Sequence, residues 1–312
     1  AVWVRAARRQ SAARPHSAPG TGRNRAERGA AQVGRGADAD GRHWWFDARG
    51  DFQRYDHGDQ YDGAGPGLLA GVGWQRGALT FGGFAGYGRQ ENNWGLRRGE
   101  WTQSEVTLGG VLGWRSTGGA WVNGQLSYSQ LDFDIDRDVP LGPALRTHRG
   151  STDGSNLTAA LSAGWDFGDG ALVHGPVLGV VAQRIDVDGF AESEPDLSTS
   201  LAYPDQSFDS LVASIGWQAS YRIHEQLQPY VRLTVDRELE KSAEEAFAQS
   251  QSLPGTLPYA VPGLDYDRRY STLTLGARTQ LFGLDANLGA SLNAGQKGGK
   301  HSMVFASLSA GF

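Results

Sequence analysis

The sequence predicts an all-β protein in which twelve antiparallel strands close into a barrel that spans a membrane. Three observations carry this prediction. Apolar and polar residues alternate from about residue 43 onward, so that every second residue from Leu284 to Ala294 is Leu or Ala. The connections between alternating segments are by turns short and long, and the chain finishes on an amphipathic segment. These features are typical of an outer-membrane barrel, whose strands present one apolar and one polar face.

The composition narrows the possible classes of protein. The 312 residues include 45 Gly, 10 Trp, one Met and no Cys, and the mean hydropathy is −0.44. Without Cys, disulfides, thiolate metal sites and cysteine nucleophiles are excluded together. An apolar share of 39% is small for a water-soluble core of this size, while ten Trp argue against disorder. The longest uncharged stretch, 246–264, contains three Pro and cannot be a spanning helix.

Residues 1–42 are expected to be a flexible leader or linker remnant, rich in Arg, Ala and Gly. Positions 1–40 hold eight Arg against three acidic residues, a formal charge of +5, whereas the remaining residues carry −10. Such a cluster could bind nucleic acid, but its only aromatic residue is Trp3, so a solvated tail is favoured and no nucleic-acid partner is expected. Because the single Met is Met303, we expect a fragment or a processed form.

Turn-forming residues divide positions 43–312 into the twelve strands. Short connections are predicted at 75–77, 116–119, 168–170, 223–226 and 282–283, and longer polar ones at 56–65, 91–99, 135–150, 189–204 and 239–267. Within the last of these, Glu244–Ala248 has a helix-like composition. An even number of strands with short turns at one end and long loops at the other fits a membrane barrel. The predicted strands are 43–55, 67–75, 78–90, 100–115, 119–134, 151–167, 171–188, 206–222, 227–238, 268–281, 284–295 and 301–312.

Charged residues on one face of the strands point to a wet interior. Inside lipid every backbone N–H and C=O needs a protein partner, which a closed cylinder provides, while its inner face can meet water. A dry core would not hold so many charges without strict pairing. A register shifted by one residue would instead turn them outward. The residues predicted to face the lumen are Asp47, Arg49, Asp51, Glu105, Arg232, Asp236 and Arg278.

Aromatic residues gather within a few positions of the short turns. Indole and phenol rings prefer the headgroup level of a bilayer, where barrels carry an aromatic girdle. The alternative is ordinary strand-end packing in a soluble barrel. The predicted girdle consists of Trp74, Trp114, Trp121, Trp165, Trp217, Tyr221 and Phe282.

The last predicted strand is amphipathic and ends the chain on an aromatic residue. Its apolar row, read back by twos from the C-terminus, consists of Phe312, Ala310, Leu308, Ala306 and Val304. Gly-aromatic segments recur earlier, at 71–74, 81–87 and 109–114, and Trp44–Gly50 opens the first strand. With these residues, positions 43–312 resemble the C-terminal translocator domain of type V autotransporters. The chain looks closest to the barrels that display a GDSL-type esterase or lipase.

The resemblance implies a protein-transport function in the outer membrane of a Gram-negative bacterium. A barrel of this family inserts as a monomer among outer-membrane lipids and exports or displays an N-terminal passenger at the cell surface. The family's final strand is read by the barrel-assembly machinery, here Val304, Ala306, Leu308, Ala310 and Phe312. A helix is expected just before residue 43, but Pro and Gly interrupt 1–40. A linked passenger is therefore expected to be absent or truncated in this chain.

The sequence offers no catalytic, cofactor-binding or metal-binding constellation. The seven His have no metal-ligand spacing, no Ser lies in a nucleophile elbow, and the Gly-rich runs lack the Lys of a phosphate loop. The GDSL motif is absent, so no enzyme activity is expected. Two other functions stay open: a porin-like channel without a passenger, and a soluble all-β domain, which the many small Ala and Gly on the apolar faces disfavour.

Overall fold

The computed structural model describes residues 41–55, 61–95, 98–240, 245–253, 255, 257–262, 268–296 and 299–311. Residues 1–40 of the predicted leader and Phe312 lie outside these residues, whereas Gly41 and Arg42, predicted as the end of the leader, belong to the first strand. No helix in the described ranges combines the length and the apolar character needed to cross a membrane.

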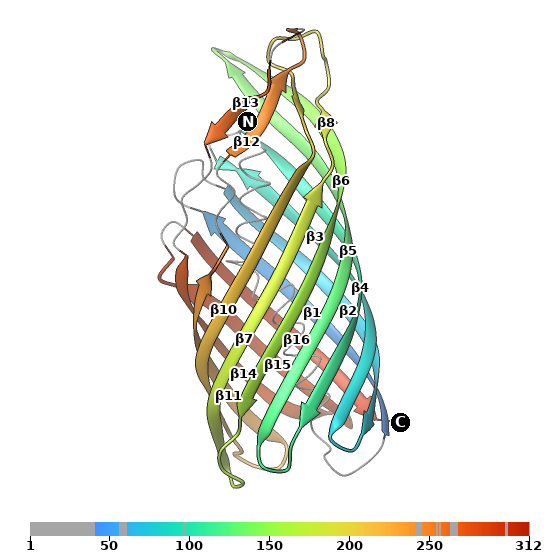
Figure 1. Ribbon diagram of the computed structural model, residues 1–312, viewed down its shortest axis with the longest axis vertical. Coiled ribbons are helices and arrows are strands. Elements are labelled where there is room, and N and C mark those ends of the chain that lie inside the picture. The colour runs from blue at the N-terminus through green and yellow to red at the C-terminus, as the bar shows by residue number, and fades with distance from the viewer. Residues whose placement is uncertain are drawn as a thin grey trace.

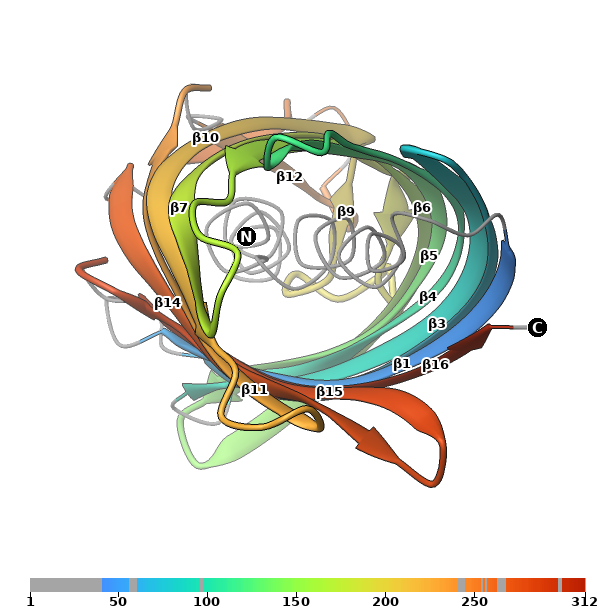
Figure 2. The same ribbon diagram turned by 90° about the horizontal axis from the view of Figure 1, so that it is seen from below.

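Twelve antiparallel strands close into a barrel, as the alternation predicts (Figure 1). Neighbours along the chain pair with each other, and β1 pairs with β16 to close the ring, which Figure 2 shows from below. The barrel strands are β1 (Gly41–Tyr55), β2 (Tyr61–Arg76), β3 (Leu79–Trp94), β4 (Gly99–Arg115), β5 (Ala120–Leu141), β6 (Ala144–Trp165), β7 (Leu172–Val187), β10 (Gln206–Tyr221), β11 (Leu227–Glu238), β14 (Arg269–Leu281), β15 (Leu284–Ala294) and β16 (Gly299–Gly311).

Four further strands form a small separate sheet where the sequence predicts long loops. These strands are β8 (Phe190–Ala191), β9 (Leu201–Tyr203), β12 (Glu245–Ser250) and β13 (Tyr259–Pro262), in the order β13-β12-β9-β8. The prediction of a helix-like segment at Glu244–Ala248 is wrong, because β12 begins at Glu245. Pairing with β9 and β13 overrides the weak local helix preference of this segment.

The predicted loop at 135–150 is also wrong, because strands β5 and β6 continue through it to a tight turn after Leu141. Leu141 pairs with Ala144 across that turn, and Gly142 there has a φ of 66°. The cause of the error lies in the faces of β5, which exchange character along the strand. Near the short turn, Leu126 and Tyr128 face outward and Ser127 and Ser129 inward.

Beyond Ser129 the pattern of β5 is reversed. Leu131, Phe133 and Ile135 are buried on the inner side, and Asp132, Asp134 and Asp136 lie on the outer side. We call the part of the barrel next to the short turns the turn half, and the part next to the long connections, beginning at Leu131 on β5, the loop half. In the sequence alone, a row of Asp is typical of a polar loop, although here the backbone is still paired with the neighbouring strand.

In the turn half, the faces lie as the alternation predicts. Ile215 is 61% exposed and Trp217 also points outward, whereas Gln218 accepts a hydrogen bond from Arg232 Nη2 across the strands, at 2.7 Å. Side chains that would meet lipid are therefore Leu, Val, Ile, Ala and aromatic residues. The opposite face is mostly polar but also carries inward apolar residues such as Trp45, Leu69 and Phe84.

Inward aromatic residues lie over inward Gly residues of the neighbouring strand. Trp45 pairs with Gly71, and a Cβ added to Gly71 would lie 2.3 Å from the indole. Such a ring covers the gap that the Gly leaves in the sheet. This arrangement uses Gly for a specific purpose, the close approach of a ring to the backbone. The same register joins Phe84 with Gly109, Trp121 with Gly164, Tyr230 with Gly276 and Phe305 with Gly289.

Candidate functional site

The inner wall of the barrel carries a charged group built from three strands. Arg49 on β1 lies at its centre, with Nη2 3.1 Å from Glu105 Oε1 on β4 and Nε 2.9 Å from Asp51 Oδ2. His301 on β16 places Nε2 3.7 Å from the other oxygen of Asp51. Asp47 faces inward from the same strand and is buried. Positions that are 56 residues apart in sequence are thus joined by one guanidinium.

A second polar group surrounds Asp236 on β11. Its carboxylate accepts hydrogen bonds from Ser214 on β10, from Thr234 at 3.1 Å and from Thr272 on β14 at 2.7 Å. Hydroxyl donors on three strands therefore satisfy a carboxylate that is fully buried in the structure. These Ser and Thr partners were not predicted, although their inward phase on the alternating strands was a usable signal.

Arg232 and Arg278 lie elsewhere on the same wall. Arg232 donates to Gln218, and the Arg278 guanidinium stands over the Tyr230 ring at 5.0 Å from its centre. All seven residues predicted to face the lumen are therefore placed on the inner side. The structure brings Asp47, Arg49, Asp51 and Glu105 into one group and places Arg232, Asp236 and Arg278 on β11 and β14.

Most of the predicted girdle residues point outward beside the short turns. Trp74 stacks on Phe81, and Trp217 stacks on His174, both at 5.8 Å between ring centres. Trp114, Trp165 and Tyr221 are exposed as well. Phe282 is 103% exposed at the tip of its turn, with a φ of 52°. Phe167, which stacks on Trp217 and meets the His174 ring in a tilted arrangement, belongs to the same surface and was missed.

The assignment of Trp121 to the girdle is wrong. Trp121 is 4% exposed and lies on the inner side of β5, above Gly164 of β6. Proximity to a short turn does not decide which face a residue takes, because that depends on the phase of the strand. Gly164 is what leaves room for the indole on the inner side.

The last strand closes the barrel against the first. Val304 pairs with Gly50 and Leu308 with Phe46 across the β1–β16 boundary. Together with Ala306 and Ala310, these two residues form the outward row of β16, and Ser307 and Ser309 are buried on the inner side. The predicted assembly signal thus occupies the outer face of the closing strand, with Phe312 beyond the described range.

The small sheet lies at the outer mouth and packs against the inner wall of the loop half. Leu201 and Tyr203 of β9 and Ala248 of β12 join an apolar cluster with wall residues from β2, β3, β4, β5 and β7. Phe190 of β8 stacks on Tyr203 with ring centres 4.7 Å apart. The wall residues are Tyr61, Trp94, Trp101, Leu131, Phe133, Ile135, Ile185 and Val187. The apolar inner face of the loop half is therefore covered by the small sheet.

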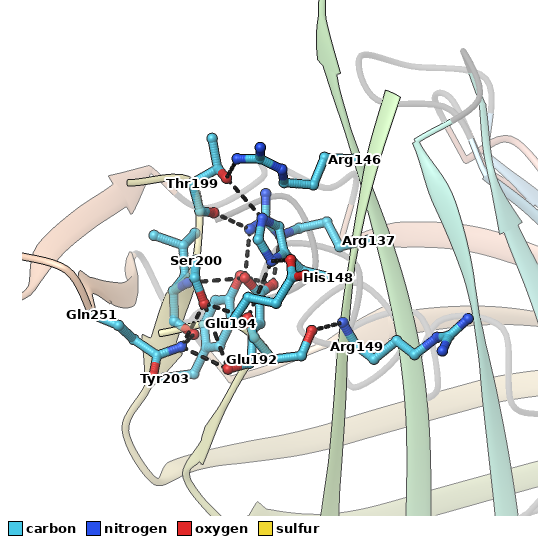
Figure 3. A network of polar contacts seen from close by, with 12 residues as sticks. Arg137, Arg146, His148, Arg149, Glu192, Glu194, Thr199, Ser200, Tyr203 and Gln251 are labelled. Carbon is cyan, nitrogen blue, oxygen red and sulfur yellow. Dashed lines mark hydrogen bonds and ion pairs between the residues drawn. The ribbon is translucent and has the colours of Figure 1, made fainter. Parts of the chain in front are cut away.

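A buried ion pair fastens the sheet to the wall (Figure 3). Arg137 of β5 donates through Nε and Nη2 to the two oxygens of Glu192, both at 2.5 Å, and through Nη2 to the Thr199 carbonyl at 2.7 Å. Glu192 Oε2 also accepts from the Leu201 backbone N–H at 2.9 Å. Burial raises the pKa of the Tyr203 phenol well above its usual value, and this neutral hydroxyl donates to Glu192 Oε1 at 3.3 Å.

His148 of β6 adds a second attachment beside Arg137. Its ring is fully buried, with Nε2 2.8 Å from Thr199 Oγ1 and Nδ1 3.2 Å from the Ser193 carbonyl. The ring thus joins one side-chain hydroxyl and one backbone carbonyl of the 188–205 connection to the barrel wall. Figure 3 shows His148 beside Thr199. Across the described ranges, no three His, Cys, Asp or Glu residues are grouped so that they could hold a metal ion.

Known proteins resemble this chain in sequence and in fold. Over 107 residues the chain is 31% identical to "Lipase 1" of Photorhabdus luminescens, a match that covers 34% of this chain and 16% of that protein. The translocator domain of the autotransporter NalP from Neisseria meningitidis superposes with a TM-score of 0.75 at 15% identity, covering 96% of this chain and 98% of that chain. The beta domain of the Bordetella autotransporter BrkA gives 0.65 at 18% identity, covering 88% and 100%.

At these low sequence identities, the structural similarities show the fold alone. The family is shown by a sequence model of the autotransporter beta-domain, which matches residues 44–295. This family places the twelve-stranded barrel in the outer membrane of Gram-negative bacteria, in the context of a linked passenger. The chain therefore belongs to the autotransporter beta-domain family and is an outer-membrane translocator domain.

Proposed function

We propose that this barrel carries a covalently linked N-terminal passenger to the cell surface and anchors it there. One geometric observation supports the direction of transport. β1 enters at the short-turn end, where Gly41 pairs with Gln75, and β16 ends at the same side, where Gly311 pairs with His43. A passenger joined ahead of β1 has to cross the length of the barrel to appear at the long-loop end.

The chemistry of the inner wall in the turn half suits the passage of an unfolded chain. Hydroxyl, amide and charged side chains line it, and they can exchange hydrogen bonds with a moving backbone and with water. Arg49 is paired with Asp51 and Glu105, and Asp236 accepts hydrogen bonds from neighbouring hydroxyls. A passing segment would therefore meet a mostly polar wall, which also carries the inward apolar cluster of Trp45, Leu69, Phe84 and Val111.

We propose a lipase or esterase as the passenger, and no catalysis within the barrel. The support is the sequence match to a protein named a lipase, which extends over 107 residues of this chain. The GDSL nucleophile motif is absent from the printed sequence, so hydrolysis would belong to the passenger.

We also propose that the outward row of β16 is the surface that the barrel-assembly machinery reads and that later faces lipid. Val304, Ala306 and Leu308 present short apolar side chains in one line. Their strand pairs with β1, which is the last pairing needed to close the ring. The outward Trp and Tyr residues at the short-turn end would hold the barrel at the inner headgroup level.

A reporter fusion tests export directly. A small protease-sensitive reporter is fused ahead of residue 1 and the full chain is expressed in a Gram-negative host. The expected result is a heat-modifiable barrel in the outer membrane, with the reporter cleaved by protease added to intact cells. A barrel that shifts on heating while the reporter stays protected contradicts export. Selective solute conduction by that barrel in planar bilayers would then favour the porin-like channel.

A further inference from the structure

We propose that the small sheet is a closed lid over the outer mouth, made of two leaves, and that it opens along the boundary between β9 and β12. The fixed leaf is residues 188–205, with β8 and β9. The moving leaf is the described part of residues 245–262, with β12 and β13. Only the purpose of lid opening rests on the proposed function, since an exported passenger has to leave through this mouth.

The lid is closed because its inner side is buried against the barrel wall. Ala248 of the moving leaf and Leu131 of the wall are each 0% exposed, and they belong to one apolar cluster. Leu201 and Tyr203 of the fixed leaf belong to it as well. A segment that merely crossed above the mouth would not bury side chains from both leaves and from five barrel strands.

The fixed leaf is attached to the wall at several places along its length. Asp188 N–H donates to the Asp153 carbonyl at 2.9 Å, and Thr152 Oγ1 donates to the Asp188 carbonyl at 2.7 Å. Ser193 N–H donates to the Arg149 carbonyl at 2.7 Å. With the Arg137–Glu192 ion pair and the His148 contacts, these bonds hold the N-terminal end and the middle of the leaf to β5 and β6.

The moving leaf is held differently. Its β12 pairs with β9 at two positions only, Gln249 with Ala202 and Ser250 with Leu201. Next to them, Gln251 Nε2 donates to Ser200 Oγ at 2.7 Å, the Glu192 carbonyl at 2.8 Å and the Leu201 carbonyl at 3.0 Å. The Gln251 backbone N–H also donates to the Ser200 carbonyl, at 3.2 Å. These bonds all run to the fixed leaf, so the two backbone pairs and the contacts of Gln251 make the boundary. Few bonds, all on one line, are where a local opening begins.

Thiol labelling of the closed face tests the lid. The chain has no Cys, so Ala248→Cys introduces a single thiol beneath the moving leaf, and Leu257→Cys, at a position 86% exposed, serves as the reference. The full chain is folded in lipid vesicles and treated with a membrane-impermeant maleimide. We expect the Ala248→Cys thiol to react at least about tenfold more slowly than the reference thiol. Its labelling should nevertheless be faster than the unfolding of the barrel.

A boundary variant then tests where the lid opens. Adding Gln251→Ala removes three hydrogen bonds of the boundary and should raise the labelling rate of the Ala248→Cys thiol about tenfold or more. The matched control, Gln130→Ala, removes an exposed amide from the outer side of β5 and should leave the rate unchanged. Equal labelling of the two thiol positions in the parent chain would show that no lid closes, and equal effects of the two Gln variants would exclude opening at this boundary.

Hydrogen exchange on the parent chain gives a second measurement in case Ala248→Cys fails to fold. We expect peptides of the moving leaf to exchange faster than peptides of the fixed leaf, and Gln251→Ala to accelerate the moving leaf alone. Simultaneous exchange of both leaves with the barrel strands would overturn the proposal. Neither measurement requires a passenger, so a failure of the lid is distinguishable from a failure of export.

Discussion

The same strands run through the turn half and the loop half of the barrel, but the apolar face of these strands is the outer one in the turn half and the inner one in the loop half. In the turn half of β5, Leu126 faces outward and Gln125 inward, whereas in the loop half Phe133 faces inward and Asp134 outward. β7 repeats the exchange, with Leu178 outward in the first half and Arg184 outward in the second. The outer side of the turn half suits acyl chains, and the outer side of the loop half suits water.

The difference follows from what each half has to bury. The turn half has lipid outside, so its apolar side chains point there and its inner wall is free to be polar. The loop half has water outside, and its apolar side chains turn inward, where the small sheet covers them. A closed cylinder thus carries a membrane-protein arrangement at one end and a soluble-protein arrangement at the other, with one continuous backbone ladder between them.

The largest effect is expected from the buried ion pair of the loop half. Arg137→Gln leaves the Glu192 carboxylate buried without its cation, which should lower the free energy of opening of the fixed leaf by about 3–5 kcal/mol, or open it fully. Hydrogen exchange of residues 188–205 measures this. Arg149→Gln, whose exposed side chain lies 3.7 Å from Asp136, removes the same charge and should cost only about 0–1 kcal/mol. Equal costs for both variants would contradict a structural role of the pair.

A smaller effect separates the outer faces of the two halves. Leu126→Arg places a charge on the lipid side of the turn half and should lower the free energy of unfolding in vesicles by about 2–4 kcal/mol, whereas Gln130→Arg, at an already polar outward position that borders the loop half, should cost about 0–1 kcal/mol. Denaturant titration of the folded barrel, followed by the heat-dependent gel shift, reports both values. If the two substitutions cost the same, the outer face does not change character near Leu131.

The smallest effect concerns the tip of a short turn. Phe282 adopts a φ of 52°, a backbone conformation that Asn adopts at a lower energetic cost than an aromatic residue. In detergent, Phe282→Asn should raise the free energy of unfolding by about 1 kcal/mol. In bilayers we expect the gain to shrink, because the exposed ring is lost from the headgroup level. A gain of the same size in both media would mean that Phe282 does not anchor the barrel.

The two halves also differed in how far they could be predicted. The twelve strands were predictable because lipid outside and water inside impose an alternation that any short window of sequence displays, as in Leu284–Ala294. The inward charges Arg49 and Glu105 followed from the same phase. The loop half was misread at 135–150, since a soluble arrangement with an outward row of Asp looks like a loop. The segment Glu245–Ala248 was misread because its pairing with β9 and β13 cannot be seen in the local sequence.

Residue order alone was enough to specify the number of barrel strands, their approximate bounds and the apolar or polar character of the rows in the turn half, because a period of two is a local property of an extended chain. It did not reveal which side chains contact one another across strands. Trp121 turns inward because Gly164, on the next strand, leaves space for it, and Arg137 finds Glu192 at a distance of 55 residues along the chain. Such contacts depend on register and closure, which bring together side chains that no local pattern connects.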